Sequence, residues 1–396
     1  MSGARARAGL LALSLLTAAS AADAAAPQPR VATDARMDLM GLVELLSGAP
    51  GVPRDPFTDA AAARFSSLRG DPAVRGAAAI RARGASRGLL MQYAVYLSSP
   101  PELAETAPIA PYFYAPFGGR ARLEDWRKDL SAFARKSGFL AWENETRAQR
   151  ESFAAAARRA QGGRDLGAPL QRLLGARTWG DWVVFVTPFS PEGGSDSWIM
   201  EERGGRPQVV VIFGPYWDGR SFGVVRPAEF AAAAWPEAVF TMTYALSEAC
   251  RHAFLLTHEI CRGLPGLVNI EDCVQHYWVR ELVARLVEGS YGRAAASGYL
   301  ETGGGPYDGA VRASIETYVR GRARYRDLLD AAAPLYAPFN GGASAAACRV
   351  DDPARFSEPI YARRMAYYLE GRVEAGPDAK ASAELEELRA GGVIPR

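Results

Sequence analysis

The sequence predicts an α+β protein that is predominantly α-helical, with a small antiparallel sheet followed by a long helix and a helical C-terminal half. Three observations support this class. β-Branched and aromatic runs of strand length are concentrated near the middle of the chain. The longest helical pattern, residues 236–262, follows them. Apolar residues recur at helical spacing through much of the remaining sequence.

The chain begins with a pattern typical of a secretory signal peptide. Arg5 and Arg7 precede a short apolar run that ends at Leu16, and small residues follow as far as Ala24. The apolar run is shorter than the roughly 20 residues that a membrane-spanning helix needs. We therefore expect residues 1–24 to be cleaved and the mature protein to be exported to the periplasm or secreted, with no membrane span.

Residues 25–33 are expected to be a linker, and residues 34–375 a single domain, because no later linker divides the chain. The first helix should begin after Asp34, whose side chain suits a helix cap, and end before Gly48. Further helices are expected over residues 58–67, 73–96, 123–135, 145–160 and 169–174.

The middle of the chain changes character. Strands are expected over residues 182–189, 197–201 and 208–214, and we expect them to form a small antiparallel sheet. The long helix that follows should begin at Pro236, since proline suits a first helical position, and should close at the Gly263–Gly266 cluster. Further helices are expected over residues 270–288, 311–332 and 353–369, followed by a loosely docked tail, residues 376–396.

Composition excludes one class of partner and suggests one kind of cross-link. The formal net charge is only +2, which argues against a nucleic-acid-binding protein with a clustered basic face. An even number of cysteines in an exported protein favours disulfide bonds. Cys250 and Cys261 would lie roughly 16 Å apart on a continuous helix, too far for a bond. Cys261 and Cys273 flank a Gly/Pro turn, so we favour this pair, with Cys250 bonded to Cys348.

Residues 247–288 concentrate the side chains that are capable of metal, redox or proton chemistry. The histidines of the chain all lie there: His252, His258 and His276. A zinc site is therefore an alternative to the disulfides. His258 and Cys261, like Cys273 and His276, each place two ligands one helical turn apart, and two facing pairs would form a tetrahedral centre.

A third interpretation is a family resemblance. The segments that carry it are residues 34–40, 182–189, 209–214, 244–254 and 276–281. With a small sheet, a long helix and a second helix in that order, the chain resembles a group of exported bacterial proteins with a zinc-metallopeptidase (HExxH-type, zincin-like) helix. The resemblance implies a zincin-like fold in which two histidines hold zinc and the glutamate between them activates water.

The motif is degenerate in this chain. Ser247 and Arg251 stand at the two histidine positions, and Glu248 alone matches. The downstream ligand position is matched by His276, or less well by Glu281. Since a guanidinium at a ligand position repels a divalent cation, the resemblance implies a site without metal. The purely structural alternative is that Ser247, Glu248 and Arg251 form only the polar stripe of a core helix.

The sequence therefore favours an exported metallopeptidase-like protein that has lost its metal and has a binding or structural role, with a peptide or an envelope protein as partner. Ser247, Glu248 and Arg251 are the candidate site residues, and we expect no cofactor. One alternative is an active peptidase with zinc held by His252, His258 and His276 and with Glu248 as general base. The other is a disulfide-stabilised structural protein of the envelope.

Overall fold

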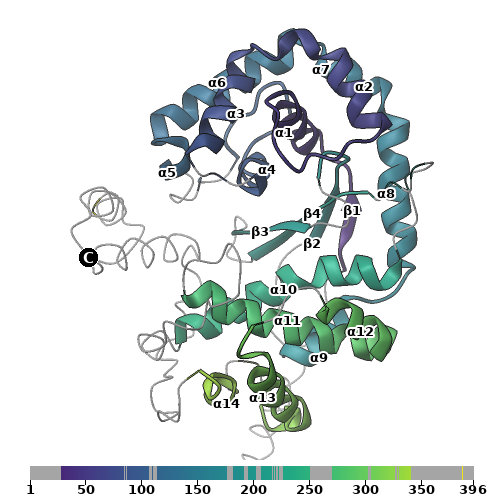
Figure 1. Ribbon diagram of the computed structural model, residues 1–396, viewed down its shortest axis with the longest axis vertical. Coiled ribbons are helices and arrows are strands. Elements are labelled where there is room, and N and C mark those ends of the chain that lie inside the picture. The colour runs from purple at the N-terminus through teal and green to yellow at the C-terminus, as the bar shows by residue number, and fades with distance from the viewer. Residues whose placement is uncertain are drawn as a thin grey trace, which may run out of the picture.

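The computed structural model describes residues 28–83, 87–106, 114–175, 182–190, 195–201, 207–215, 226–249, 270–301, 305–325 and 330–339, with residues 85, 109, 217, 219, 222, 328 and 386. In this part of the chain the protein is mostly helical around one four-stranded sheet (Figure 1). None of the described helices has the length and apolar composition needed to cross a bilayer.

The sheet combines three parallel strands with one antiparallel strand. The strands are β1 (Arg30–Ala32), β2 (Trp182–Val186), β3 (Ser195–Glu201) and β4 (Pro207–Phe213), and their order in the sheet is β1-β2-β4-β3. β1 pairs with β2 and β2 with β4 in parallel, and only β3 runs antiparallel to its neighbour β4. The prediction of a small antiparallel sheet, and with it the zincin-like fold class stated above, is therefore wrong, although the broader α+β class holds.

The order of the strands explains the error. β4 lies between β2 and β3, so β2 and β3, which are consecutive in the sequence, do not pair. β1 was missed because it is only three residues long and lies inside the segment expected to be a linker. The sheet edge at β1 is covered by α8 (Arg147–Gln161), where Arg158 donates a hydrogen bond of 3.0 Å to the carbonyl of Val31.

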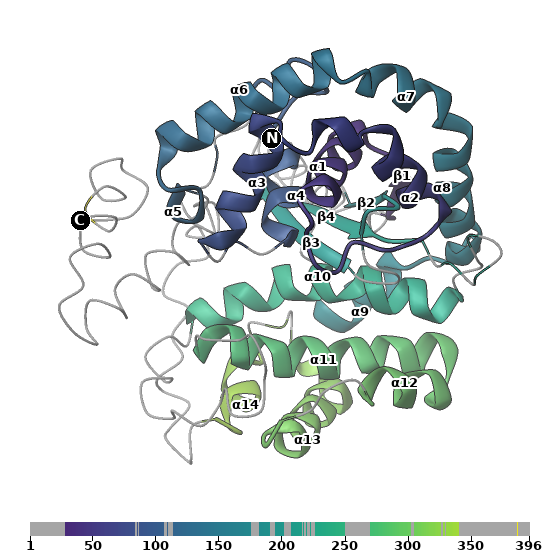
Figure 2. The same ribbon diagram turned by 45° about the horizontal axis from the view of Figure 1, so that its top comes forward.

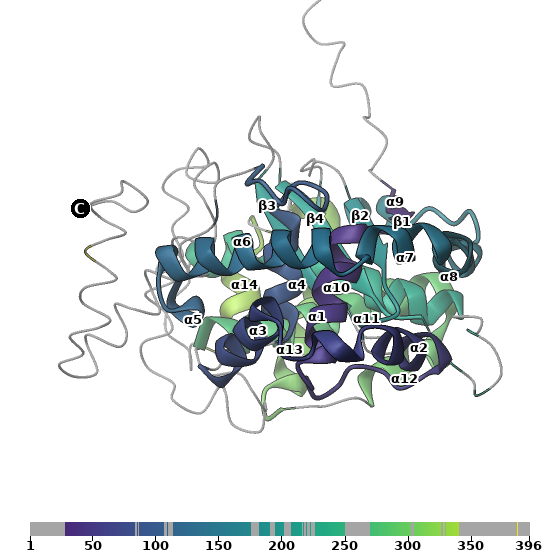
Figure 3. The same ribbon diagram turned by 90° about the horizontal axis from the view of Figure 1, so that it is seen from above.

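Most of the helices between β1 and β2 build one side of the core, and the last of them, α9, lies on the other side. They are α1 (Ala35–Leu46), α2 (Pro56–Arg64), α3 (Pro72–Ala82), α4 (Arg87–Val95), α5 (Tyr114–Phe117), α6 (Arg120–Lys136), α7 (Phe139–Glu145), α8 and α9 (Gly167–Leu174). Asp34 caps α1 by accepting a hydrogen bond from the Arg36 amide, as predicted. The helix predicted over residues 73–96 is divided into α3 and α4, the one predicted over residues 145–160 is α8, and α7 was not predicted. Helices α6, α7 and α8 form an arc around α1–α4 (Figures 2 and 3).

The helices after the sheet cover its other face. They are α10 (Pro227–Ala249), α11 (Ile270–Tyr291), α12 (Arg293–Leu300), α13 (Asp308–Arg320) and α14 (Ala332–Tyr336). α10 begins nine residues before the predicted start, so Pro236 lies inside the helix. Pro227 takes the first helical position instead, and Glu229 accepts a hydrogen bond from the Arg226 amide as in a capping box.

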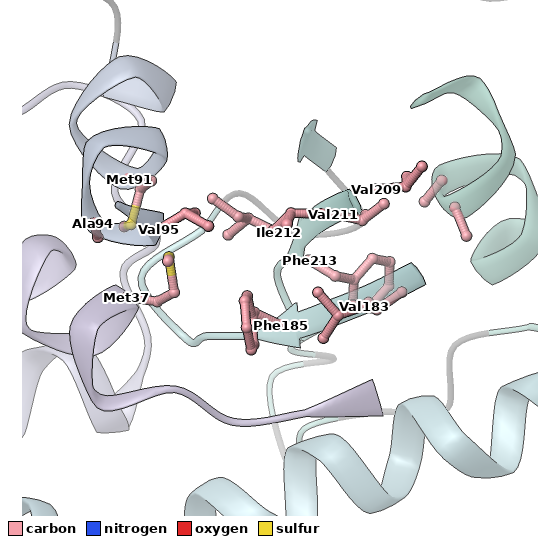
Figure 4. Close-up of a cluster of buried hydrophobic side chains, with 14 of the residues drawn as sticks. Met37, Met91, Ala94, Val95, Val183, Phe185, Val209, Val211, Ile212 and Phe213 are labelled. Atoms are coloured by element: carbon pink, nitrogen blue, oxygen red, sulfur yellow. The ribbon is translucent and has the colours of Figure 1, made fainter. Parts of the chain in front are cut away.

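The core lies between these two groups of helices. Buried side chains of β2 and β4 lie between α1 and α4 on one side and α10 on the other (Figure 4). Phe213 of β4 contacts Phe230 of α10, with ring centroids 5.7 Å apart. β2 and β4 are buried on both faces, which is typical of parallel strands covered by helices and explains their nearly unbroken runs of apolar residues.

Candidate functional site

The structure places the predicted site residues unevenly. Ser247 and Glu248 belong to the last turn of α10, and nothing further is described of their side chains. Arg251, His252 and His258 lie outside the described residues, as do Cys250, Cys261 and Cys348. His276 and Cys273 lie on α11, together with Glu281. The candidate motif itself is therefore not tested, but the helix that would face it is described.

Helices α10 and α11 pack side by side and run in opposite directions (Figures 1 and 2). Trp235, in the first half of α10, contacts Tyr291 at the end of α11, with ring centroids 6.2 Å apart. This contact fixes the register between the two helices. The C-terminal turn of α10, with Ser247 and Glu248, consequently lies beside the N-terminal half of α11.

Glu281 is already bound by a guanidinium group. Its two carboxylate oxygens accept hydrogen bonds of 3.0 and 3.1 Å from Arg312 on α13. The Glu281 carboxylate is almost completely buried, whereas Arg312 is partly exposed. A bidentate arginine occupies the lone pairs that a metal would need, so Glu281 serves to hold α13 against α11.

His276 lies one turn before a second ion pair. Arg280 forms a salt bridge with Asp308 at the start of α13 and also donates a hydrogen bond to the carbonyl of Leu300. Burial, and then the nearby Arg280 guanidinium, lower the pKa of His276 below its ordinary value, and Asp308 opposes the shift. His276 therefore favours the neutral imidazole, because burial and the Arg280 guanidinium both disfavour its protonated form.

Cys273 is fully buried on α11 and is disulfide-bonded. The other three cysteines lie outside the described residues, so the Cys261–Cys273 and Cys250–Cys348 pairings stay predictions. Within the described part of the chain, no group of three or more His, Cys, Asp and Glu side chains is arranged to hold a metal ion.

Gln275 is the unusual side chain of α11. It is only 1% exposed, and neither the oxygen nor the nitrogen of its amide has a hydrogen-bond partner among the described residues. A buried amide without partners costs about 1–3 kcal/mol, so such groups are rare in native proteins. The amide presents one acceptor and one donor group, which is the pattern that complements a peptide group.

A second polar cluster was not anticipated from the sequence. Asp38 on α1, Glu143 on α7 and Arg150 on α8 meet at the end of β2. Arg150 lies 3.0 Å from the Asp38 carboxylate and 2.7 Å from that of Glu143, and it also donates a hydrogen bond to the backbone carbonyl of Glu143. The hydroxyl of Thr187, directly after β2, donates a 2.7 Å hydrogen bond to Asp38.

Two acids share one base in this cluster, and both are shifted. Burial, reinforced by the Asp38 charge, raises the pKa of Glu143 to about 8, while Arg150 opposes the shift. Burial also raises the pKa of Asp38, to about 6, against the effects of Arg150 and Thr187. The sequence signal was weak, because Asp38 is one of two acids, with Glu44, in a helix whose other residues are mostly apolar.

Comparisons of the chain with protein-family models, with curated proteins and with solved structures found no match.

Proposed function

We propose that this protein is exported and binds an extended peptide or a segment of an envelope protein, and that it is not a metal-dependent peptidase. Export rests on the signal-peptide pattern of residues 1–24. The binding role rests on the chemistry of α11 and on the edge of the sheet beside α10.

The observation that carries the proposal is that Glu281 on α11 is already paired with an arginine. Both oxygens of Glu281 are bound by Arg312, and the nearby Arg280 guanidinium disfavours a positive charge on His276. Zinc needs deprotonated ligands in a site without competing cations. The guanidinium groups of Arg280 on α11 and of Arg312 on α13, beside the side chains that would supply the downstream ligand, therefore favour a role without metal.

Two further features support peptide binding. The buried amide of Gln275 offers a donor and an acceptor that no described residue uses. β3 forms one edge of the sheet over seven residues, and no described strand pairs with its outer side. An extended segment adds readily to such an edge through main-chain hydrogen bonds.

The first test measures metal and peptidase activity. The mature protein, purified without chelators, is examined by elemental analysis and by incubation with a mixed pool of fluorogenic peptides. We expect no stoichiometric zinc and no cleavage. One zinc per chain, with cleavage that chelation abolishes, would establish the alternative of an active peptidase and would overturn the proposal.

The second test measures binding. A pool of fluorescein-labelled random dodecapeptides is titrated with the wild-type protein and with the Gln275→Met variant, and anisotropy is recorded. We expect binding by the wild type and a loss of at least tenfold in affinity for the variant. Gln149→Met, at an exposed position of α8, is the matched control. No binding by the wild type would favour the disulfide-stabilised structural protein instead.

A further inference from the structure

The cluster of Asp38, Glu143 and Arg150 at the end of β2 has one acid more than its arginine can neutralise. It contains two carboxyl groups and one guanidinium, so it would carry a net negative charge if both acids were ionised. Asp38 and Arg150 have side chains that are 0% and 4% exposed, and Glu143 is only slightly more accessible. A net charge at this depth is strongly unfavourable, and uptake of a proton removes it.

We propose that the triad of Asp38, Glu143 and Arg150 is a proton-binding latch, which carries one proton on Glu143 in the folded protein and loosens when that proton is released to water at alkaline pH. This inference is independent of the proposed peptide binding. It concerns how the α7–α8 corner is held to α1 and to the end of β2.

The hydrogen bonds determine which acid carries the proton. Asp38 receives a hydrogen bond from the Thr187 hydroxyl as well as from Arg150, so its ionised form has two donors. One oxygen of Glu143 faces Arg150, and the other has no partner among the described residues. An anion with fewer donors is the less stable of the two, so the proton resides on Glu143.

The surrounding charges do not cancel this preference. Asp34, at the start of α1, repels both acids, and it is itself held by Arg36 at 2.6 Å. Arg147 on α8 acts on Glu143 in the opposite sense, but it is exposed to solvent. The remaining neighbours at this end of α7 are aromatic: Trp142 contacts Phe57 and Phe189, with ring centroids 5.5 and 6.3 Å apart.

The latch joins three parts of the chain that are distant in the sequence: α1, the α7–α8 corner and the residues after β2. Asp38 and Arg150 are 112 residues apart, and Asp38 and Thr187 are 149 residues apart. Thr187 also begins the turn after β2, because its carbonyl accepts a hydrogen bond from the Ser190 amide. Ionisation of Glu143 would therefore disturb contacts of α1, α7 and α8 together with the chain that leads toward β3.

The direction of the pH dependence follows from the raised pKa of Glu143. In the unfolded chain Glu143 ionises near its ordinary value, and in the folded protein it keeps its proton to a higher pH. The stabilisation is thus complete at acidic pH and is lost as the pH rises to the folded-state pKa. One proton bound only by the folded state lowers Tm by about 2 °C for each pH unit in that interval.

The test compares Tm against pH for the wild-type protein, Glu143→Gln and Glu145→Gln. Glutamine imitates protonated glutamic acid and leaves Arg150 an oxygen to contact. The difference in Tm between the wild type and Glu143→Gln should therefore change steadily between pH 5 and 8, with the variant the more stable relative to wild type at pH 8. Glu145, two residues further along the same helix, pairs with Arg64 at the surface, so Glu145→Gln should parallel the wild type.

A spectroscopic measurement covers the case in which Glu143→Gln does not fold. The infrared carbonyl band of a protonated carboxylic acid should be present in ¹³C-glutamate-labelled wild type at pH 7 and should disappear above pH 9. A Tm difference that is independent of pH, or the absence of that band at pH 7, would overturn the proposal.

Discussion

Replacement of Gln275 by methionine should make the protein more stable, although the residue is completely buried. Methionine has nearly the same length and volume, so the packing around α11 is retained and no cavity forms. The change removes one donor group and one acceptor that have no partners among the described residues. Because an unpartnered buried amide costs about 1–3 kcal/mol, we expect a gain of about 1–2 kcal/mol in the free energy of unfolding.

Urea denaturation and differential scanning calorimetry of the mature protein measure this change. A gain of that size corresponds to a rise of about 1–3 °C in Tm. Gln149→Met is again the control, and it should stay within about 0.5 kcal/mol of the wild type because its side chain is exposed. A destabilisation of more than about 1 kcal/mol by Gln275→Met would mean that the amide has a partner within the folded chain, and the reasoning would fail.

Two further predictions concern packing and the α11–α13 contact. Arg312→Gln leaves the buried carboxylate of Glu281 without its cation and should lower the free energy of unfolding by about 2–3 kcal/mol, less than for a fully buried pair because Arg312 is partly exposed. In a urea titration, the double variant with Glu281→Gln should recover much of this loss, and additive losses would contradict the pairing. Gly41→Ala places a methyl group 2.2 Å from the Phe189 side chain and should lower the free energy of unfolding by about 1–3 kcal/mol or more. Gly70→Ala, with open space around it, should not lower it, and equal Tm values for these two variants would refute the close packing.

The sequence predicted most helices because their signals are local. Asp34 and Gly48 mark the two ends of α1, and the structure confirms both positions. The start of α10 was misplaced for the same reason. Pro227 and Pro236 both suit a first helical position, and only the capping interaction of Glu229 with the Arg226 amide distinguishes them.

The direction of the strands could not be found from local signals. The unbroken apolar runs of β2 and β4 are typical of parallel strands that are buried on both faces. To predict that they pair in parallel, one must also know which strands are neighbours in the sheet. Here β3 lies outside β4, and the short β1 adds to the other edge. Both facts depend on contacts between distant parts of the chain.

The buried cluster illustrates the same limit for a site. Its acids and its arginine belong to three helices, and no spacing between Asp38, Glu143 and Arg150 indicates that they meet. A search by motif is drawn to residues 247–288, where histidine and cysteine are concentrated. It overlooks residues whose chemistry arises from burial, which becomes visible only when the fold is known.

Partnering distinguishes the two kinds of buried polar group in this protein. Each charged group of the Asp38 cluster contacts another member of the cluster, so the fold itself accounts for these three residues. What varies with pH in this cluster is the proton on Glu143. Gln275 differs, because both ends of its amide are without partners in the described part of the chain. This part of α11 is therefore where we expect a ligand of the proposed binding protein to be held.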